Sequence, residues 1–341
     1  MTQSSDAIVP LGAMRFNSDS QKLEYWMGSA WMQIQTFSPN LNGGTRGVYA
    51  KGTQPGGDAN LIQFITISTA GDAVDFGDAP TASSSEILGG VASNTRGVFA
   101  GGYSNPAHLN LIEFVTIAQQ GDSIDFGDLA GGAGAHGGQG VSNQTRGIFA
   151  IGNNAPGFSS TNRMDFITIA STGNATDFGD TITTSNNGAC GSPTRGVLFG
   201  GSEPSGLSNI IQFITIGTLG NAQDFGDLPT IHNAPQAAGN SIRGLNMGGS
   251  APSPAGDVNT IEYITIATTG NGRDFGDLTQ TVRSLNATSD PTRMVRLGGY
   301  SDTDVMDYVQ IATTGNAIDF GNLINNSRAG AAFSNGQGGL G

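Results

Sequence analysis

The chain repeats one pattern of apolar and polar positions six times. The clearest copy spans residues 95–128, where TRGVFAGG is followed by a polar spacer, LIEFVTIA, a Gly-Asp pair and SIDFGD. One phenylalanine of the pattern recurs at Phe76, Phe126, Phe178, Phe225, Phe275 and Phe320, with gaps of 50, 52, 47, 50 and 45 residues. A period of this length is typical of propeller blades rather than of short solenoid repeats.

Each copy predicts several short β-strands. The first is the segment 46–50 and its equivalents, which ends at one or two glycines. The second is apolar on both faces, as expected for a strand that is covered on both sides; its copies lie at 61–67, 111–117, 163–169, 210–216, 260–266 and 305–311. A Gly-Asp or Gly-Asn pair then predicts a tight hairpin, so that the DFGD segment returns as an antiparallel third strand.

A fourth strand is predicted between each DFGD segment and the next TRG, in Gly-rich stretches such as SSEILGGVASN. The first copy has no such stretch before it, whereas SRAGAAFSN follows the sixth copy at residues 327–335. We therefore expect this C-terminal segment to complete the first sheet and to remove an open sheet edge. The expected fold is an all-β propeller of six blades at residues 41–341, closed by a C-terminal strand.

Residues 1–40 differ from the repeats and contain both tryptophans. Apolar and polar positions alternate in three short runs, at 13–16, 22–27 and 30–34, which predicts a small β-meander. Such a sheet is marginal alone, so we expect Phe16, Tyr25, Trp26 and Trp31 to pack against a partner. The segment is a candidate anchoring or oligomerisation module; if it joined the repeats, the propeller would have seven blades.

Composition narrows the classes of function. The net charge is −13, and only two of the 14 basic residues are lysines, so no basic stripe is available for nucleic acid. The single cysteine, Cys190, excludes an intramolecular disulfide. The sequence has neither an apolar run of membrane-spanning length nor a recognisable signal pattern, so we expect a soluble chain without membrane insertion.

The repeats resemble a known family. The order of strand, Gly-Gly, variable loop, aromatic strand, Gly turn and strand resembles a kelch repeat, with the Phe of DFGD at the kelch tryptophan position. TIEYITIATTGN and TRGVFAGGY are similar to kelch-like repeats in virion structural proteins of cyanobacterial phages. RFNSDSQKLEYWMGSAWMQI resembles a short module near the start of phage fibre and other virion proteins.

This resemblance implies a virion structural protein of the tail, neck or fibre type, assembled in the host cytoplasm. It implies a non-enzymatic appendage without a cofactor, whose N-terminal module attaches to the particle. The partners then expected are other virion proteins, further copies of the chain and host cell-surface polysaccharide. Two alternatives stay open: a carbohydrate-active depolymerase, whose paired carboxylates could come from separate loops, and a decoration protein of the capsid or neck.

The DFGD segments contain the most regular charges. A cluster such as Asp72, Asp75 and Asp78 could in principle supply oxygen ligands to calcium, but a structural role without a bound metal is favoured. We predict ring-wise pairing between one arginine and one aspartate of each copy. The arginines are Arg46, Arg96, Arg146, Arg195, Arg243 and Arg293, and the aspartates are Asp75, Asp125, Asp177, Asp224, Asp274 and Asp319.

Variable loops are the candidate binding surface. The loops after Gly-Gly and after DFGD are predicted to leave the sheets on one face, and the Gly-Asn hairpins on the other. The first face differs strongly between copies, as in TQPGGDAN and YSNPAHLN. Function often lies on loops held by a rigid scaffold, although unconstrained drift of surface loops explains the variation equally well. Candidate contact residues are Tyr103, His108, Phe158, His232 and Tyr300.

Histidine chemistry is not favoured by the sequence. His108, His136 and His232 occupy different places in their copies and lack the spacing of a metal site. We expect these histidines to be solvated loop residues and no residue to be catalytic.

Overall fold

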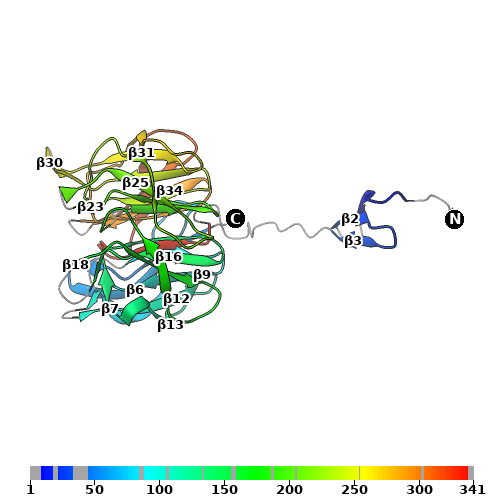
Figure 1. The fold of residues 1–341 in the computed structure, drawn as a ribbon, viewed down its shortest axis with the longest axis horizontal. Helices are drawn as coiled ribbons and strands as arrows, with labels where there is room; N and C mark the ends of the chain where they lie inside the picture. The colour runs from blue at the N-terminus through cyan, green and yellow to red at the C-terminus, as the bar shows by residue number, and fades with distance from the viewer. Residues whose placement is uncertain are drawn as a thin grey trace. The chain divides into compact units, whose positions relative to one another are not determined.

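The computed structural model describes residues 9–17, 22–33, 45–83, 88–104, 107–132, 134–154, 159–185, 188–203, 206–252, 254–300 and 303–336. The described residues form β-strands and loops, with one short 3-10 turn at Ala130–Gly132. The chain divides into two compact units, Met1–Asn42 and Gly43–Gly341 (Figure 1). No helix in the described part is long and apolar enough to span a membrane.

Antiparallel sheets with four main strands build the larger unit, one for each copy of the repeat. In the second copy the strand order is β8 (Leu88–Ala92), β9 (Arg96–Ala100), β12 (Leu111–Thr116) and β13 (Ile124–Asp128). The next four sheets keep this order. They comprise β15 (Gln139–Ser142), β16 (Arg146–Ala150), β19 (Arg163–Thr168) and β20 (Thr176–Asp180); β21 (Gly188–Gly191), β22 (Arg195–Phe199), β25 (Ile210–Thr215) and β26 (Gln223–Asp227); β27 (Gln236–Gly239), β28 (Arg243–Met247), β31 (Thr260–Thr265) and β32 (Arg273–Asp277); and β33 (Asn286–Ser289), β34 (Arg293–Gly299), β35 (Thr303–Gln310) and β36 (Ile318–Asn322).

The remaining sheet combines the two ends of the larger unit. Its order is β37 (Ala331–Ser334), β4 (Arg46–Ala50) and β6 (Gly57–Thr66), with β5 (Thr53–Gln54) and β7 (Val74–Ser83) also paired to β6. Phe333 lies opposite Val48 in the antiparallel register of β37 and β4. The prediction that the C-terminal segment completes the first sheet is therefore confirmed.

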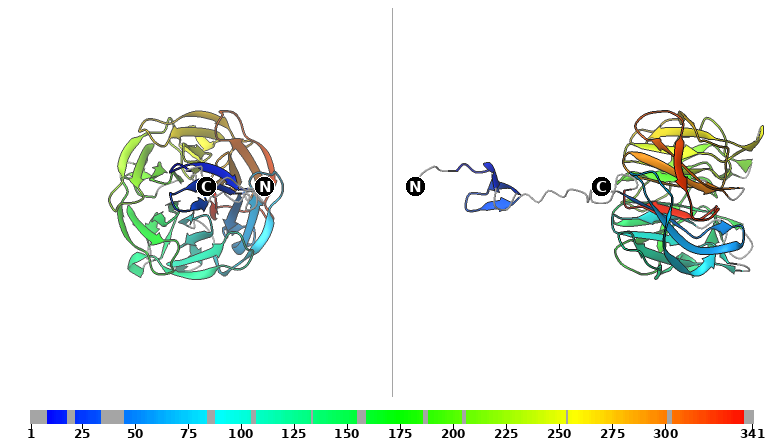
Figure 2. Two further views of the ribbon diagram at one scale, coloured as in Figure 1. Left: turned by 90° about the vertical axis from the view of Figure 1, so that its right-hand side faces the viewer. Right: turned by 180° about the vertical axis from the view of Figure 1, so that it is seen from behind.

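The strands that begin each sheet, here called the inner strands, contact one another in sequence. β8 contacts β15, and the contacts continue through β21, β27 and β33 to β37, which also contacts β8. Figure 2 shows the sheets arranged around a common axis. Crowding at this axis explains the Gly-rich composition of the inner strands and their partners, since a Cβ atom at Gly97 would collide with the Phe333 ring, and one at Gly140 with Gly89.

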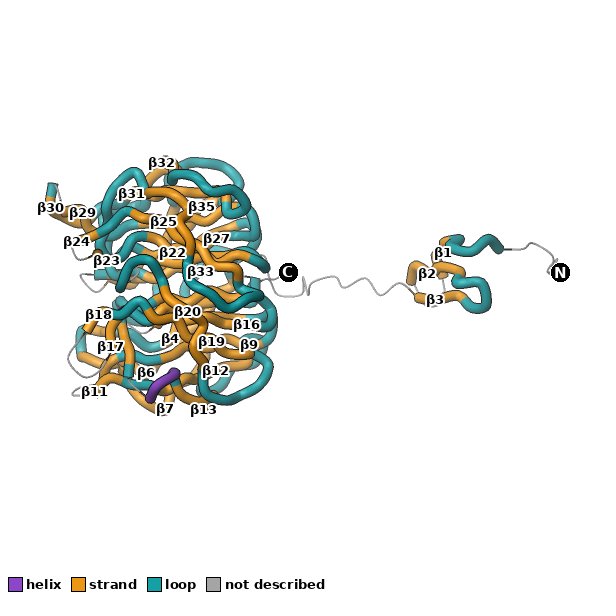
Figure 3. The backbone as a smooth tube through the Cα atoms, in the orientation of Figure 1, coloured by secondary structure: helices purple, strands orange, loops and turns teal. Residues whose placement is uncertain are grey.

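Strand directions define two faces of the larger unit. The loops after Gly-Gly and after DFGD leave the sheets on one face, here called the loop face, and the Gly-Asp and Gly-Asn turns lie on the opposite hairpin face. The Gly-Gly loops contain short hairpins that were not predicted from the sequence pattern (Figure 3). They are β10 (Tyr103–Ser104) with β11 (Ala107–His108), β17 (Asn153–Asn154) with β18 (Ser159–Ser160), β23 (Ser202–Glu203) with β24 (Gly206–Leu207), and β29 (Ser250–Pro252) with β30 (Ala255–Asp257). β17 also pairs with β14 (Ala135–His136).

The N-terminal unit contains the predicted meander. β1 (Met14–Asn17), β2 (Lys22–Trp26) and β3 (Trp31–Gln33) form one antiparallel sheet in that order. These strands pair with one another and form a sheet separate from the repeat sheets. Residues 34–40 of the predicted module lie outside the described residues.

Candidate functional site

Adjacent sheets are bonded where the turn of one copy meets the DFGD strand of the preceding copy. Between the first two copies, Gly121 N donates to Phe76 O at 2.8 Å and Ser123 N donates to Asp78 O at 3.0 Å. The Asp122 carboxylate accepts a third bond, from Asp78 N at 2.9 Å. These bonds satisfy backbone groups at the outer edge of the sheet, where open edges invite aggregation.

The same joint recurs between the other copies, including the sixth and the first. Gly71 N donates to Phe320 O at 2.7 Å, Ala73 N donates to Asn322 O at 2.8 Å, and Asp72 Oδ1 accepts Asn322 N at 2.9 Å. The second position of each Gly-Asp or Gly-Asn turn is therefore an acceptor for a neighbouring backbone amide. Asp72 belongs to such a joint, and no group of three candidate metal ligands occurs in the described residues.

The glycine of DFGD is explained by the same joint. Gly127 has a φ of +148°, and a Cβ atom there would lie 2.5 Å from Gly173 O of the next copy. Only glycine accepts both this conformation and this close approach without strain. Phe126, one position earlier, is 3% exposed and meets the Phe114 ring edge-on at 6.0 Å between centroids.

The repeated arginines bind carbonyl oxygens of the next copy. Arg96 Nη1 donates to Ile169 O at 2.9 Å, and its guanidinium carbon lies 4.2 Å from the centroid of the Phe114 ring. Arg293 joins the sixth copy to the first through Ile67 O at 3.2 Å. The remaining four make the equivalent bond at 2.8 to 3.1 Å: Arg46 to Ile117, Arg146 to Ile216, Arg195 to Ile266 and Arg243 to Ile311.

The predicted pairing of arginine with aspartate is wrong. The first aspartate of each DFGD or DFGN segment is exposed; this set comprises Asp75, Asp125, Asp177, Asp224, Asp274 and Asp319. None of the ion pairs between described residues joins a member of this set to a repeated arginine. Each repeated guanidinium instead contacts an aromatic ring and donates a hydrogen bond to a carbonyl oxygen. These contacts give a structural role to the arginines but not to the aspartates.

A polar position is buried in the third strand of each sheet, and it was not predicted. It holds Gln63, Glu113, Asp165, Gln212, Glu262 and Asp307, each at most 4% exposed. Gln212 accepts Ile182 N at 2.6 Å, and Asp307 is bonded to the fully buried Arg296 at 2.6 Å. Burial raises the pKa values of Asp165 and Glu262. The signal was present in the sequence, because each copy interrupts an apolar strand with one polar residue at the same place.

Two of the three histidines are buried, contrary to prediction. His136 is 5% exposed, and its ring stacks on His108 at 4.6 Å between centroids. Burial, together with the charge of His108, lowers the pKa of His136 to about 4. His232 is 2% exposed, with Nε2 2.5 Å from Thr230 Oγ1, and burial lowers its pKa. The burial of His232 leaves it little surface for the contact role that we predicted.

The other predicted contact residues fall into two groups. The Tyr103 ring lies 5.0 Å from the His108 ring, which extends the histidine stack. Tyr300 is 40% exposed and lies against two guanidinium groups, those of Arg283 at 3.8 Å and Arg328 at 5.0 Å. Phe158 lies outside the described residues.

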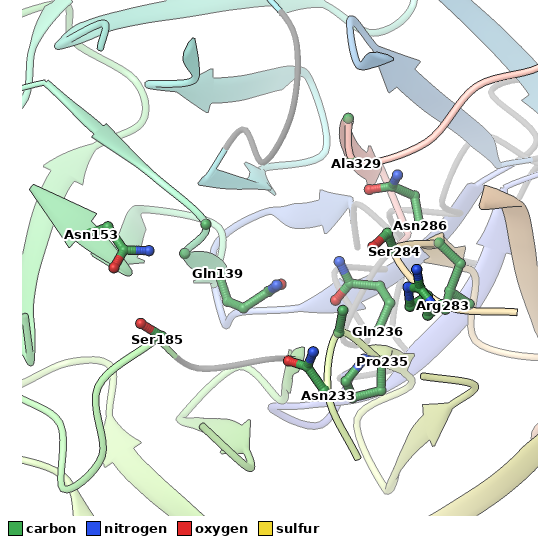
Figure 4. A pocket seen from close by; sticks show the side chains of 15 residues that line it. Gln139, Asn153, Ser185, Asn233, Pro235, Gln236, Arg283, Ser284, Asn286 and Ala329 are labelled. Atoms are coloured by element: carbon green, nitrogen blue, oxygen red, sulfur yellow. The ribbon is translucent and has the colours of Figure 1, made fainter. Parts of the chain in front are cut away.

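A pocket of about 380 Å³ opens among the loops that lead into the inner strands (Figure 4). Residues from several copies line it, and we call it the axial pocket because the inner strands surround the axis of Figure 2. Its polar side chains belong to Gln139, Asn153, Ser185, Asn233, Gln236, Arg283, Ser284 and Asn286. Gln139 and Gln236 extend into the space between the surrounding loops (Figure 4). None of these side chains was predicted, since the pocket exists only after distant copies assemble.

The rim of the axial pocket is built from equivalent turns in the left-handed backbone conformation. Ser185, Ala234, Ser284 and Ala329 have φ values of 49°, 53°, 50° and 52°, and Gly137 has 68°. Ser284 N donates to Ala234 O at 2.9 Å, and Ala329 N donates to Ser284 O at 3.0 Å. A non-glycine residue in this conformation is strained and persists only where its surroundings fix it, which is common at ligand sites.

The N-terminal sheet separates an apolar face from a polar and aromatic one. Met14, Phe16, Leu23, Tyr25 and Met32 share one face by register, and all five are exposed. On the other face Arg15 is paired with Glu24 at 2.9 Å and lies 4.2 Å from the Trp31 ring, which in turn contacts Trp26 at 5.5 Å. The four predicted anchoring residues are thus divided between the two faces, with Phe16 and Tyr25 on the apolar one.

Comparisons with known proteins assign no family. No protein-family model matches the chain, and no curated protein matches it.

Proposed function

We propose that the chain is a non-enzymatic phage virion appendage, in which the larger unit is a six-bladed, kelch-like propeller. The contacts between inner strands and the bonds from the sixth copy back to the first support this architecture. The likeness of TRGVFAGGY and of the N-terminal module to virion structural proteins supports the biological role.

One observation carries the assignment of the binding face. β4 begins and β37 ends on the hairpin face, where Arg46 N donates to Asn335 Oδ1 at 3.0 Å beside the end of β6. Attachment of the chain from this side leaves the loop face, with the axial pocket, available to a host surface or to a neighbouring virion protein. The exposed apolar face of the N-terminal sheet is suited to anchoring, because so small a sheet needs a covering partner.

Binding is favoured over cleavage by the chemistry of the axial pocket. Its polar side chains are amides, hydroxyls and one guanidinium. Most glycoside hydrolases use two carboxyl groups, which the residues lining this pocket do not supply. A depolymerase site elsewhere on the loop face is the alternative that an assay must separate, together with a purely decorative role on the capsid or neck.

Purified protein incubated with host cells and with their surface polysaccharide tests the proposal. We expect saturable binding without release of reducing ends. Release of reducing ends would establish the depolymerase alternative, and absence of binding to cells and polysaccharide would favour decoration.

Deletion of residues 1–40 tests the anchoring role. The truncated protein should bind cells as the full chain does but should be missing from assembled particles. Normal incorporation of the truncated protein would show that the module is not the anchor.

A further inference from the structure

Several hydrogen-bonding groups of the axial pocket are unused within the described residues. Gln236 Oε1 accepts a hydrogen bond from Ala237 N at 2.9 Å. The NH₂ group of Gln236 has no hydrogen-bond partner among the described residues. The side chains of Asn233 and Ser284 also have no hydrogen bond to other described residues. Asn153 accepts a bond from Ser160 Oγ at 3.1 Å and keeps its NH₂ group available. The pocket therefore presents donors and acceptors to a ligand.

The charge of the pocket is balanced internally. Arg283 is the ionisable residue of the lining, and its Nη1 atom lies 2.7 Å from Asp257 Oδ1. The same guanidinium covers the Tyr300 ring at 3.8 Å. Because this cation already has a carboxylate and an aromatic partner, the pocket has no unpaired charge with which to select an anion.

We infer that the axial pocket binds one uncharged sugar residue of a polysaccharide, an inference that rests on the proposed role of the loop face in host-surface binding. Sugar hydroxyls both donate and accept hydrogen bonds, as do the amides of Gln236 and Asn233. The volume of about 380 Å³ lies near the lower end of the range for small-ligand pockets and suits a single ring rather than a folded segment. Backbone hydrogen bonds already hold Ala234, Ser284 and Ala329 in place at the rim. Less conformational entropy is therefore lost when a ligand binds.

The test combines the full chain with two kinds of probe. Thermal unfolding is measured with glucose, galactose, mannose and N-acetylglucosamine at high concentration, because a ligand that binds only the folded state raises Tm. Calorimetry is performed with the neutral and the acidic fractions of host polysaccharide. We expect at least one neutral sugar to raise Tm and the neutral fraction to bind more tightly.

Variants locate the site. Asn233→Ala combined with Gln236→Ala removes two side chains of the pocket and should raise the Kd for the neutral fraction at least about tenfold. Gln223→Ala on the exposed outer strand β26 removes a comparable amide and should leave the Kd unchanged. Both proteins should retain the wild-type Tm without ligand to within a few degrees.

The outcomes separate this inference from the proposed function. Polysaccharide binding that is equal in the double variant and the wild type would overturn the axial pocket as the site and leave the host-surface role standing. Preferential, salt-sensitive binding of the acidic fraction that is lost in Arg283→Gln would overturn the neutral ligand class. If no neutral sugar raises Tm and neither fraction binds, the pocket inference and the host-surface role both fail.

Discussion

Replacing Gly226 by alanine should break the joint between the fourth and fifth copies. Gly226 has a φ of +148°, and a Cβ atom there would lie 2.6 Å from both the carbonyl carbon and oxygen of Gly270. These are backbone atoms of a tight turn, so they can move only if the neighbouring sheet moves as well. The substitution therefore adds backbone strain and separates the two sheets.

The magnitude follows from the bonds at this joint. Gly270 N donates to Phe225 O and Gly272 N donates to Asp227 O, each at 2.8 Å, and Asp227 N donates to Asn271 Oδ1 at 3.1 Å. Loss of each bond costs about 1 kcal/mol, and the left-handed backbone adds about 1 kcal/mol for alanine. We expect the free energy of unfolding to fall by about 3 to 4 kcal/mol, which lowers Tm by roughly 6 °C or more in a unit of this size.

Urea and thermal unfolding of the full chain measure this loss. The matched control is Gly217→Ala, since nothing lies within 4 Å of a Cβ atom at Gly217 and the equivalent residues Ala118 and Ala267 are already alanine. The control should keep or slightly raise the stability. A loss of less than about 1 kcal/mol in Gly226→Ala, or a loss no greater than that of the control, would show that this joint does not stabilise the unit.

Three further predictions address the repeats, the closure and the buried histidine. Arg195→Gln should lower the free energy of unfolding by about 2 kcal/mol, because it removes the hydrogen bond to Ile266 O. Asp224 is exposed, so Asp224→Ala should change this free energy by less than about 0.5 kcal/mol. Equal losses for the two variants in urea unfolding would support the arginine–aspartate pairing. Deletion of residues 327–341 removes β37, so it should expose the first sheet and produce proteolysis between residues 45 and 83, and a protease-resistant truncated chain would argue against closure. Because the pKa of His136 is lowered from 6.5 to about 4, the stability that this group contributes should be present above pH 6.5 and lost as the pH falls toward 4. His136→Phe should therefore make the urea midpoint depend less steeply on pH in this range. An unchanged pH dependence would exclude His136 as its source.

Much of the fold could be predicted because the repeat encodes local structure. Alternation, turn residues and the period identified the strands around Phe126 and the C-terminal strand that completes the first sheet. The hydrogen-bond partners of the repeated arginines could not be predicted in the same way. The acceptor of each repeated arginine is a backbone carbonyl, which every residue possesses, so the sequence drew attention to the aspartates instead.

The site was predicted less well for a related reason. The loop face could be identified from strand directions, but the burial of His136 and His232 depends on tertiary packing, such as the stacking of His136 on His108. The axial pocket combines Gln139, Gln236 and Arg283 from three copies. Amide residues at the start of two inner strands, Gln139 and Gln236, were visible in the sequence, yet their convergence follows only from the assembled sheets.

Electron microscopy of purified phage particles labelled with antibody against the hairpin of β29 and β30 tests whether the chain is a virion appendage. This hairpin lies on the loop face, which should face outward in an appendage. We predict label at one defined external position on intact particles, in register with a tail, neck or fibre structure. Absence of the protein from purified particles, with label confined to lysate, would contradict the proposed function.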